Sequence, residues 1–224
     1  MILAAYDGDA LLDWSWVQDH TTEIWLAVRE HMELVGWSLL WGVVLAVPLA
    51  VLAHRHRFFR GPALSAVGIL YTIPSLAAFA LLVPYTGLDQ STAIIPLTTY
   101  TLLILVRNVL AGLDGIEPDV REAAVGMGYS SFGMLTRVEL PLAVPAILAG
   151  VRIAAVTLIG LVPVAALVGQ GGLGTFMLDG LNRAFQTPLT VGIVLVLVLA
   201  VGVDFLIVLL QRLVAPWDRK GRRA

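Results

Sequence analysis

The sequence predicts an all-α membrane protein, a polytopic bundle of about five transmembrane helices. Hydrophobic residues make up 58% of the 224-residue chain and charged residues 13%, and the mean hydropathy is +0.88. A soluble domain of this length cannot bury so much apolar surface. Five stretches reach the roughly 20 apolar residues that a helix needs to cross a bilayer core ~30 Å thick. Open strands would leave backbone groups unpaired in hydrocarbon, and the alternation of a β-barrel is missing, so we expect these stretches to be helices.

The five predicted spans form one membrane domain over residues 34–212. We expect the spans at residues 34–53, 62–83, 92–110, 142–168 and 189–211. The first four contain prolines, among them Pro48, Pro74, Pro96, Pro145 and Pro163. Proline kinks a helix or lies near its end, and a membrane helix tolerates it where neighbours or water satisfy the freed carbonyls.

The segment before the first span, residues 1–33, is expected to lie at the extracytoplasmic membrane surface. It holds seven acidic residues and one basic residue, Arg29, so it lacks the positive start of a secretory signal peptide and is expected to be retained. Tryptophans at positions 14, 16, 25, 37 and 41 are typical of a stretch that lies at a membrane interface and leads into a span.

The positions of lysine and arginine predict the orientation, because cytoplasmic loops are enriched in both. One set of connections holds 11 of the 14 basic residues: Arg55, Arg57, Arg60, Arg107, Arg121, Arg137, Arg212, Arg219, Lys220, Arg222 and Arg223. The opposite set holds Arg29 and Arg183. We therefore predict an external N-terminus, a cytoplasmic loop at residues 111–141, and a basic cytoplasmic tail at residues 213–224.

Several functions are excluded by composition and missing motifs. The net charge of -2 does not suit a nucleic-acid binder, and the chain has no cysteine for thiolate chemistry. His54 and His56 lie among three arginines, a poor environment for a divalent metal, so a solvated or lipid-facing cluster is favoured. No nucleotide-binding P-loop and no hydrolase signature occurs. We expect no enzymatic activity, no cofactor and no metal.

The predicted cytoplasmic loop contains the most informative stretch, EPDVREAAVGMGYSSFGMLTRVELP at residues 117–141. Pro118 favours a helix start, and the helix then has one small-residue apolar face made by Val120, Ala123, Ala124 and Met127. Glycines end this helix, and Ser130 or Ser131 begins a second one whose apolar side chains are Phe132, Leu135 and Val138. An exposed apolar stripe of this kind predicts a docking surface.

This loop resembles the cytoplasmic EAA loop of type I ABC importer permeases. The residues that carry the resemblance are Glu122, Ala123, Ala124, Gly128, Val138, Leu140 and Pro141, with Val138 where isoleucine is commoner. In that family the loop forms a coupling helix that sits in a groove of a cytoplasmic ATPase. The resemblance therefore implies that ATP hydrolysis belongs to a partner subunit, to whose rim Arg121 and Glu122 can pair.

The resemblance extends over residues 31–211 to the osmoprotectant subgroup of these bacterial permeases, which import glycine betaine, choline and carnitine. It rests on the strings YTIPSLAAFALLVPYTG, RNVLAGL, GMGYSS, VELPLAVPAILAGVRIAAV and VGQGGLG. One departure is Val109-Leu110, where the subgroup usually has Thr-Tyr. The family implies a second permease subunit, identical or not, and an extracytoplasmic binding protein as partners. Methionine or another amino acid is the alternative cargo.

Two charges, Arg152 and Asp204, fall inside predicted spans, where they are expected either to pair or to face a wet cavity separately. Polar or aromatic side chains within spans are candidates for lining a cation pathway, although helix packing explains them as well: Tyr71, Ser75, Tyr100, Asn108 and Thr157.

The GQGGLG run at residues 169–174 has no following lysine and is interpreted as a tight turn that begins an external helix near residues 175–185. A self-sufficient secondary transporter is the competing class. It would require coupling-ion ligands near the midplane and usually internal repeats, and the sequence offers neither beyond Arg152 and Asp204.

Overall fold

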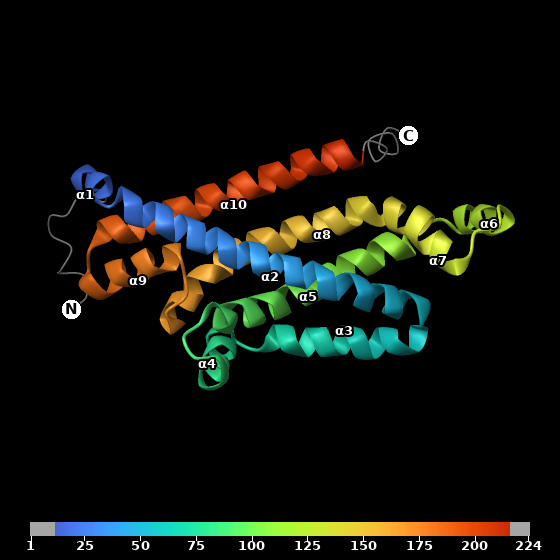
Figure 1. Ribbon diagram of the computed structural model, residues 1–224, viewed down its shortest axis with the longest axis horizontal. Coiled ribbons are helices and arrows are strands. Elements are labelled where there is room, and N and C mark those ends of the chain that lie inside the picture. The colour runs from blue at the N-terminus through green and yellow to red at the C-terminus, as the bar shows by residue number, and fades with distance from the viewer. Residues whose placement is uncertain (1–11, 216–224) are drawn as a thin grey trace. The chain divides into compact units, whose positions relative to one another are not determined.

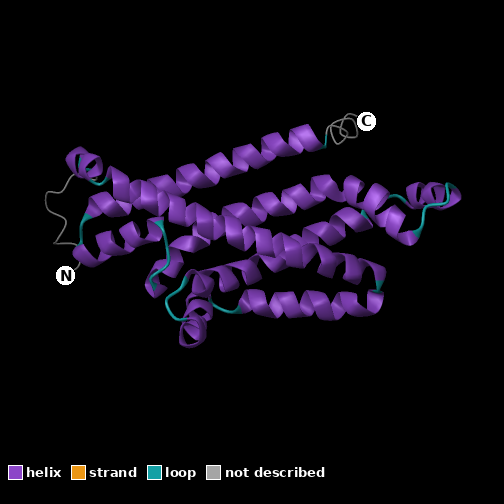
Figure 2. Ribbon diagram, viewed as in Figure 1, coloured by secondary structure: helices purple, strands orange, loops and turns teal. Residues whose placement is uncertain are grey.

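The computed structural model describes residues 12–215, and this part of the chain is helical throughout, with short loops and no strand (Figure 1, Figure 2). The elements are α1 (Trp14–Asp19), α2 (Thr21–Arg55), α3 (Arg57–Thr72), α4 (Ser75–Thr86), α5 (Gln90–Asp114), α6 (Pro118–Gly126), α7 (Ser131–Met134), the π-helical η2 (Leu135–Glu139), α8 (Leu140–Leu161), the 3-10 helix η3 (Val162–Val168), α9 (Leu173–Arg183) and α10 (Gln186–Val214). The all-α prediction is confirmed. Most of the predicted basic tail and the first third of the predicted external segment lie outside the described residues.

Four stretches of the described chain are long and apolar enough to cross a membrane: α2, α5, residues Ser131–Val168, and α10. The pair α3 and α4 meets the same criterion together but is bent by 91°. The protein therefore has four candidate spans, or five where the bent pair counts as one. All five predicted spans fall on these helices, and α2 begins well before residue 34.

The bend between α3 and α4 differs from the continuous span expected at residues 62–83. Pro74 has φ -57° and ψ 133°, an extended conformation, and α4 begins only after it. Proline disfavours helical backbone at the residue before it, here Ile73, so the helix stops at Thr72. Of the two outcomes expected for a proline, a kink or a helix end, Pro74 produces the helix end, and it does so in the middle of the predicted span.

The described chain divides into two compact units. The first comprises residues 12–40, 73–98 and 155–203, and the second residues 41–72, 99–154 and 204–215. In the first unit an apolar core joins parts of α2, α4, α5, α8 and η3: Leu34, Val35, Phe79, Ala93, Leu97, Leu158, Ile159, Val162, Ala165 and Val168. Phe79 is fully buried, so the helix after the bend is held by this core.

In the second unit, small residues let helices approach closely. A Cβ atom added to Gly112 would lie 2.9 Å from the Cβ of Ala146, and one added to Gly150 would lie 2.5 Å from the Cβ of Asn108. Both contacts join α5 to α8. Close approach at small residues is the usual way in which membrane helices associate, because lipid removes the hydrophobic drive that packs helices in water.

Candidate functional site

The loop between α5 and α8 consists of a helix, a glycine turn and a second helix, and Figure 1 shows α6 and α7 together beyond the end of α5. Pro118 occupies the first turn of α6, where its missing N–H costs nothing. Gly128 has φ +80°, and the Tyr129 N–H donates to the Ala124 carbonyl at 3.1 Å, which closes the turn. The Ser130 hydroxyl then caps α7 by accepting from the Gly133 N–H at 3.1 Å.

The seven motif residues of this loop fall into two groups. Glu122, Ala123 and Gly128 are exposed on α6 and the turn, while Ala124 is buried beneath them. The other three lie where the chain enters the next span: Val138 and Leu140 are half-buried and Pro141 is exposed. Only the first group therefore offers a free surface around the turn.

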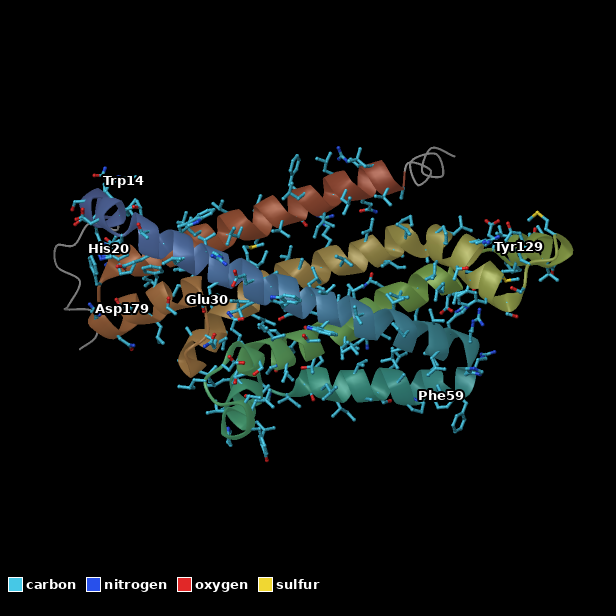
Figure 3. The ribbon with its side chains drawn as sticks, in the orientation of Figure 1. Trp14, His20, Glu30, Phe59, Tyr129 and Asp179 are labelled. Carbon is cyan, nitrogen blue, oxygen red and sulfur yellow. The ribbon has the colours of Figure 1, made fainter. Side chains whose placement is uncertain are left out.

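A concave surface, here called the loop groove, opens beside the glycine turn with a volume of about 610 Å³. It is lined by Met127, Gly128, Tyr129, Ser130, Phe132, Gly133, Thr136 and Arg137, and Figure 3 labels Tyr129 at this place. Met127 is 70% exposed and Phe132 is 73% exposed. Large apolar side chains left open around a groove mark a surface for a partner.

The second helix of the loop is not α-helical beyond Met134. Residues Leu135–Glu139 form η2, a π-helical segment, so the regular apolar face expected for Phe132, Leu135 and Val138 is interrupted. Such wide turns are frequent at functional sites. Glu139 lies in this segment and its side chain is buried.

Arg121 joins the first helix of the loop to η2 and to the end of α5. Its Nε donates to Glu139 Oε1 at 3.0 Å, and its Nη2 donates to the Leu113 carbonyl at 2.6 Å. The carboxylate of Glu139 is only 7% exposed, so this is a largely desolvated pair. The Arg121 side chain is 29% exposed and already bound within the chain, whereas Glu122 is exposed. Pairing of these two residues with the rim of a partner stays a prediction.

A second set of polar contacts joins the ends of α2, α3 and α5. Asp114 accepts from Arg60 Nη2 at 2.6 Å and from His54 Nδ1 at 2.8 Å. Arg55 Nη2 donates to the Ser131 carbonyl at 2.5 Å, which ties α2 to α7. The sequence predicts a solvated or lipid-facing position for His54, whereas the structure pairs its side chain with Asp114. Asp114 and Glu139 are two of five acids at residues 111–141, and no local pattern in the sequence distinguishes them from the other three.

Arg152 and Asp204 come together within the second unit. Arg152 Nη2 donates to Asp204 Oδ2 at 2.8 Å, and Nε also donates to Oδ1, so the contact is bidentate. The two side chains are 44% and 32% exposed. A paired charge costs far less than two separate charges at membrane depth.

The candidate pathway residues are divided between the two units. Tyr71 and Tyr100 meet edge to face with ring centroids 5.9 Å apart, and Tyr71 keeps an exposed surface while Tyr100 is buried. Asn108 Nδ2 donates to the Ile104 carbonyl of its own helix at 2.8 Å. Ser75 and Thr157 are half-buried and belong to the first unit. Tyr71 is thus the aromatic candidate of this set with an open face.

The glycine turn before α9 is tied to α2 through one carboxylate, a contact that the sequence reading missed. Glu30 Oε1 accepts from the N–H groups of Gly171 at 3.2 Å and Gly172 at 3.1 Å (Figure 3). Gly172 has φ +49°, and a Cβ added there would lie 2.6 Å from the backbone nitrogen of His31. The turn therefore needs glycine for space as well as for conformation.

His31, the next residue along α2, supports the end of α8. Its Nε2 donates to the Ile159 carbonyl at 3.2 Å. In a regular helix the N–H of residue 163 would fill that role, but Pro163 has none. His31 is fully buried, and within the described residues its Nδ1 has no hydrogen-bond partner. Two adjacent side chains of α2 thus fix the connection from α8 to α9.

Comparison with known proteins places this geometry among transport proteins. Residues 38–216 match the model of the binding-protein-dependent transport system inner membrane component family. The osmoprotectant import permease protein OsmW of Salmonella typhimurium is 36% identical over 192 residues, which cover 84% of this chain and 89% of the relative. The glycine betaine/carnitine/choline transport system permease protein OpuCB of Bacillus subtilis is 32% identical over 209 residues, 93% and 96% of the two chains.

The choline transport system permease protein OpuBB of Bacillus subtilis is 33% identical over 200 residues, 89% of this chain and 92% of the relative. Among solved structures, an inward-facing MetNI methionine ABC transporter chain superimposes with a TM-score of 0.77 and 25% identity, covering 85% of this chain and 96% of that one. These matches span nearly the whole length of the proteins compared.

Proposed function

This chain belongs to the family of binding-protein-dependent transport system inner membrane components, and from that premise we propose that it is the permease subunit of an ATP-driven importer of quaternary-amine osmoprotectants. Members of this family are multi-pass inner membrane proteins without catalytic activity of their own, and they work with an ATPase and a binding protein. The observation that carries the proposal is the EAA-type loop with its open groove, together with relatives of nearly full length whose names specify these solutes.

The substrate class is proposed to be glycine betaine, choline, carnitine or a similar quaternary amine. The relatives named for these solutes align over most of both chains, so the resemblance is not confined to the loop shared by all such permeases. A trimethylammonium group has no N–H to donate, and aromatic faces attract it through their quadrupole. The exposed face of Tyr71, whose ring is held by Tyr100, is a candidate contact for such a group.

The loop groove is the proposed docking surface for the ATPase. Glu122, Ala123 and Gly128 present small and charged groups next to the exposed side chains of Met127 and Phe132. Arg121 and Arg55 anchor the loop to the ends of α5 and α2, so a displacement imposed on the loop is transmitted to membrane helices rather than absorbed by a flexible linker.

The quaternary assembly is proposed to contain two permease subunits, two ATPase subunits and an external binding protein, surrounded by membrane lipid and without nucleic acid. The proposed orientation puts the N-terminus outside and the C-terminus in the cytoplasm, since 11 of the 14 basic residues fall on the side of the loop. The Arg152–Asp204 pair is proposed to hold α8 against α10 and not to carry protons, because arginine stays charged at any accessible pH.

Methionine is the second candidate substrate, because the structural neighbour that matches with a TM-score of 0.77 is named as a methionine transporter. Uptake into proteoliposomes that contain the permease, its ATPase and its binding protein separates the two. We expect ATP-dependent uptake of radiolabelled glycine betaine, choline or carnitine and none of methionine. Uptake of methionine alone would overturn the substrate class, and uptake driven by an ion gradient without ATP would support a secondary transporter.

A further inference from the structure

The turn between α2 and α3 carries a compact basic and aromatic cluster, HRHRFFR at residues 54–60. Helix α2 ends at Arg55 and α3 begins at Arg57, so a single non-helical residue, His56, joins them. Both helices meet the criterion for membrane-crossing segments, α3 in combination with α4. Arginine, histidine and exposed phenylalanine side chains at the end of a membrane-crossing helix are typical of the lipid-headgroup level.

Three of the five cationic or titratable side chains in this cluster are engaged by the protein itself. His54 and Arg60 both bind Asp114, and Arg55 binds the Ser131 carbonyl. Arg57 is exposed and forms no ion pair or hydrogen bond with the part of the chain that the structure describes. It is therefore the guanidinium of this turn that is available to an external anion.

Two exposed aromatic residues, Phe58 and Phe59, directly follow Arg57 in the sequence. Phe58 is 83% exposed and Phe59 is 48% exposed, and their rings meet edge to face at 5.7 Å. His56 contacts Phe59 in the same way at 6.1 Å, and Figure 3 shows Phe59 pointing away from α3. A phenylalanine ring exposed to water gains none of the free energy that burial of its apolar surface would provide. At a bilayer interface the same ring contacts glycerol and acyl groups and gains part of it.

We propose that Arg57, Phe58 and Phe59 form a binding site for the headgroup region of an anionic phospholipid. A guanidinium presents paired N–H donors that match phosphate oxygens, and the two rings cover the glycerol backbone beneath it. Phosphatidylglycerol has a net negative charge because no cation accompanies its phosphate, so this site favours it over a zwitterionic lipid such as phosphatidylcholine. Each basic residue near an anionic surface contributes about a fivefold increase in binding.

The chain has no cysteine, so a single reporter can be placed beside this site. Ser65 is exposed on α3, about 12 Å along the helix from Arg57, which puts a label at Ser65→Cys within the acyl-chain region. We would reconstitute the full chain in phosphatidylcholine vesicles and measure quenching of that label by brominated phosphatidylglycerol and by brominated phosphatidylcholine. The ratio of the two binding constants reports the local lipid preference.

We expect phosphatidylglycerol to be preferred severalfold, and we expect Arg57→Gln to lower that preference about fivefold. Arg57→Lys keeps the charge and should retain most of the preference, which separates a charge effect from misfolding. Arg183→Gln removes an exposed arginine on α9, a different part of the chain, and should leave the preference unchanged. Equal binding of the two lipids by the unsubstituted chain, or a preference that survives Arg57→Gln, would overturn the proposal.

Discussion

The EAA-type loop at residues 117–141 and the glycine turn at residues 169–172 are both built around a glycine with positive φ, yet they are held in opposite ways. In the loop, charged side chains hold the backbone on its buried side: Arg121 donates to Glu139 and to the Leu113 carbonyl. In the turn, the backbone amides of Gly171 and Gly172 bind one carboxylate, Glu30, and a Cβ added to either glycine would lie within 2.6 Å of a neighbouring backbone atom. The loop keeps its apolar side chains exposed, whereas the turn uses its surface in internal packing.

The two glycines make this difference measurable. A Cβ added to Gly128 meets nothing within 4 Å, while one added to Gly172 would meet the backbone of His31 at 2.6 Å. Glycine at position 128 is therefore required by its backbone conformation alone, and the space beside it is open. Glycine at position 172 is required both by its positive φ and by the close approach of α2. The loop surface proposed for docking and the packed turn thus differ in the atoms that lie nearest the glycine, although both glycines have positive φ.

The largest expected effect is that of Gly172→Ala. The substitution combines an unfavourable left-handed backbone with a clash against the backbone of α2, so we expect a loss of about 2–5 kcal/mol of stability. Thermal unfolding of the purified protein in detergent measures it. The matched control is Gly128→Ala, which has the backbone penalty alone and should lose about 1–2 kcal/mol. Equal losses at the two positions would remove the distinction between turn and loop.

Removing the anchor of the loop should have the next largest effect. Arg121→Ala leaves the buried Glu139 carboxylate without its partner, which costs about 3 kcal/mol for a desolvated pair. Hydrogen exchange over residues 117–141 should accelerate while α10 is unaffected. Arg183→Ala is the matched control, because it breaks an exposed pair with Asp179 that contributes only about 0.3–0.5 kcal/mol. Unchanged exchange in the loop of the Arg121→Ala variant would show that the ion pair does not hold it.

Blocking the groove should separate folding from function. Gly128→Trp adds a bulky side chain where the structure has open space, so the fold should lose only about 1–2 kcal/mol from the backbone conformation. Uptake should be abolished because the indole occupies the proposed docking surface. The comparison requires Gly128→Ala to transport in the same assay. Normal uptake by the tryptophan variant would contradict docking at this groove.

The smallest effect on stability is expected for Glu122→Lys. Glu122 is exposed, so the fold should change by less than about 0.5 kcal/mol. Reversal of its charge should still reduce the yield of the complex with the ATPase, measured by co-purification from detergent, because complementary charges at an interface rim set association. An unchanged yield would argue that Glu122 is not at the interface.

The sequence was sufficient to predict the helices, the spans and the helix–glycine turn–helix of the loop, because hydropathy, proline and glycine act locally. The complete break at Pro74 was not predicted, since the same residue kinks some helices and ends others. The wide π-helical turn at residues 135–139 was missed as well. It buries Glu139 against Arg121, and that pair depends on residues 18 apart in the chain.

Contacts between distant segments account for the other differences. Glu30 is one of several acids near the N-terminus. Nothing in the local sequence connects it to Gly171 and Gly172, which lie 141 and 142 residues further along the chain. His31 and Pro163 form a matched pair of the same kind, in which the proline removes a donor and the histidine replaces it. The Glu30 carboxylate and the His31 imidazole acquire their roles only once α2 lies beside the end of α8.

The proposed coupling to an ATPase requires the loop groove to lie on the cytoplasmic side and to be covered when the ATPase binds. Because the chain has no cysteine, Met127→Cys and Leu181→Cys each introduce one exposed thiol, on the loop and on α9. A membrane-impermeant maleimide applied to sealed right-side-out vesicles should label the Leu181→Cys variant at once. It should label the Met127→Cys variant only after permeabilisation, and less when the ATPase is bound. Labelling of Met127→Cys in sealed vesicles, without any protection by the ATPase, would contradict both the orientation and the docking role.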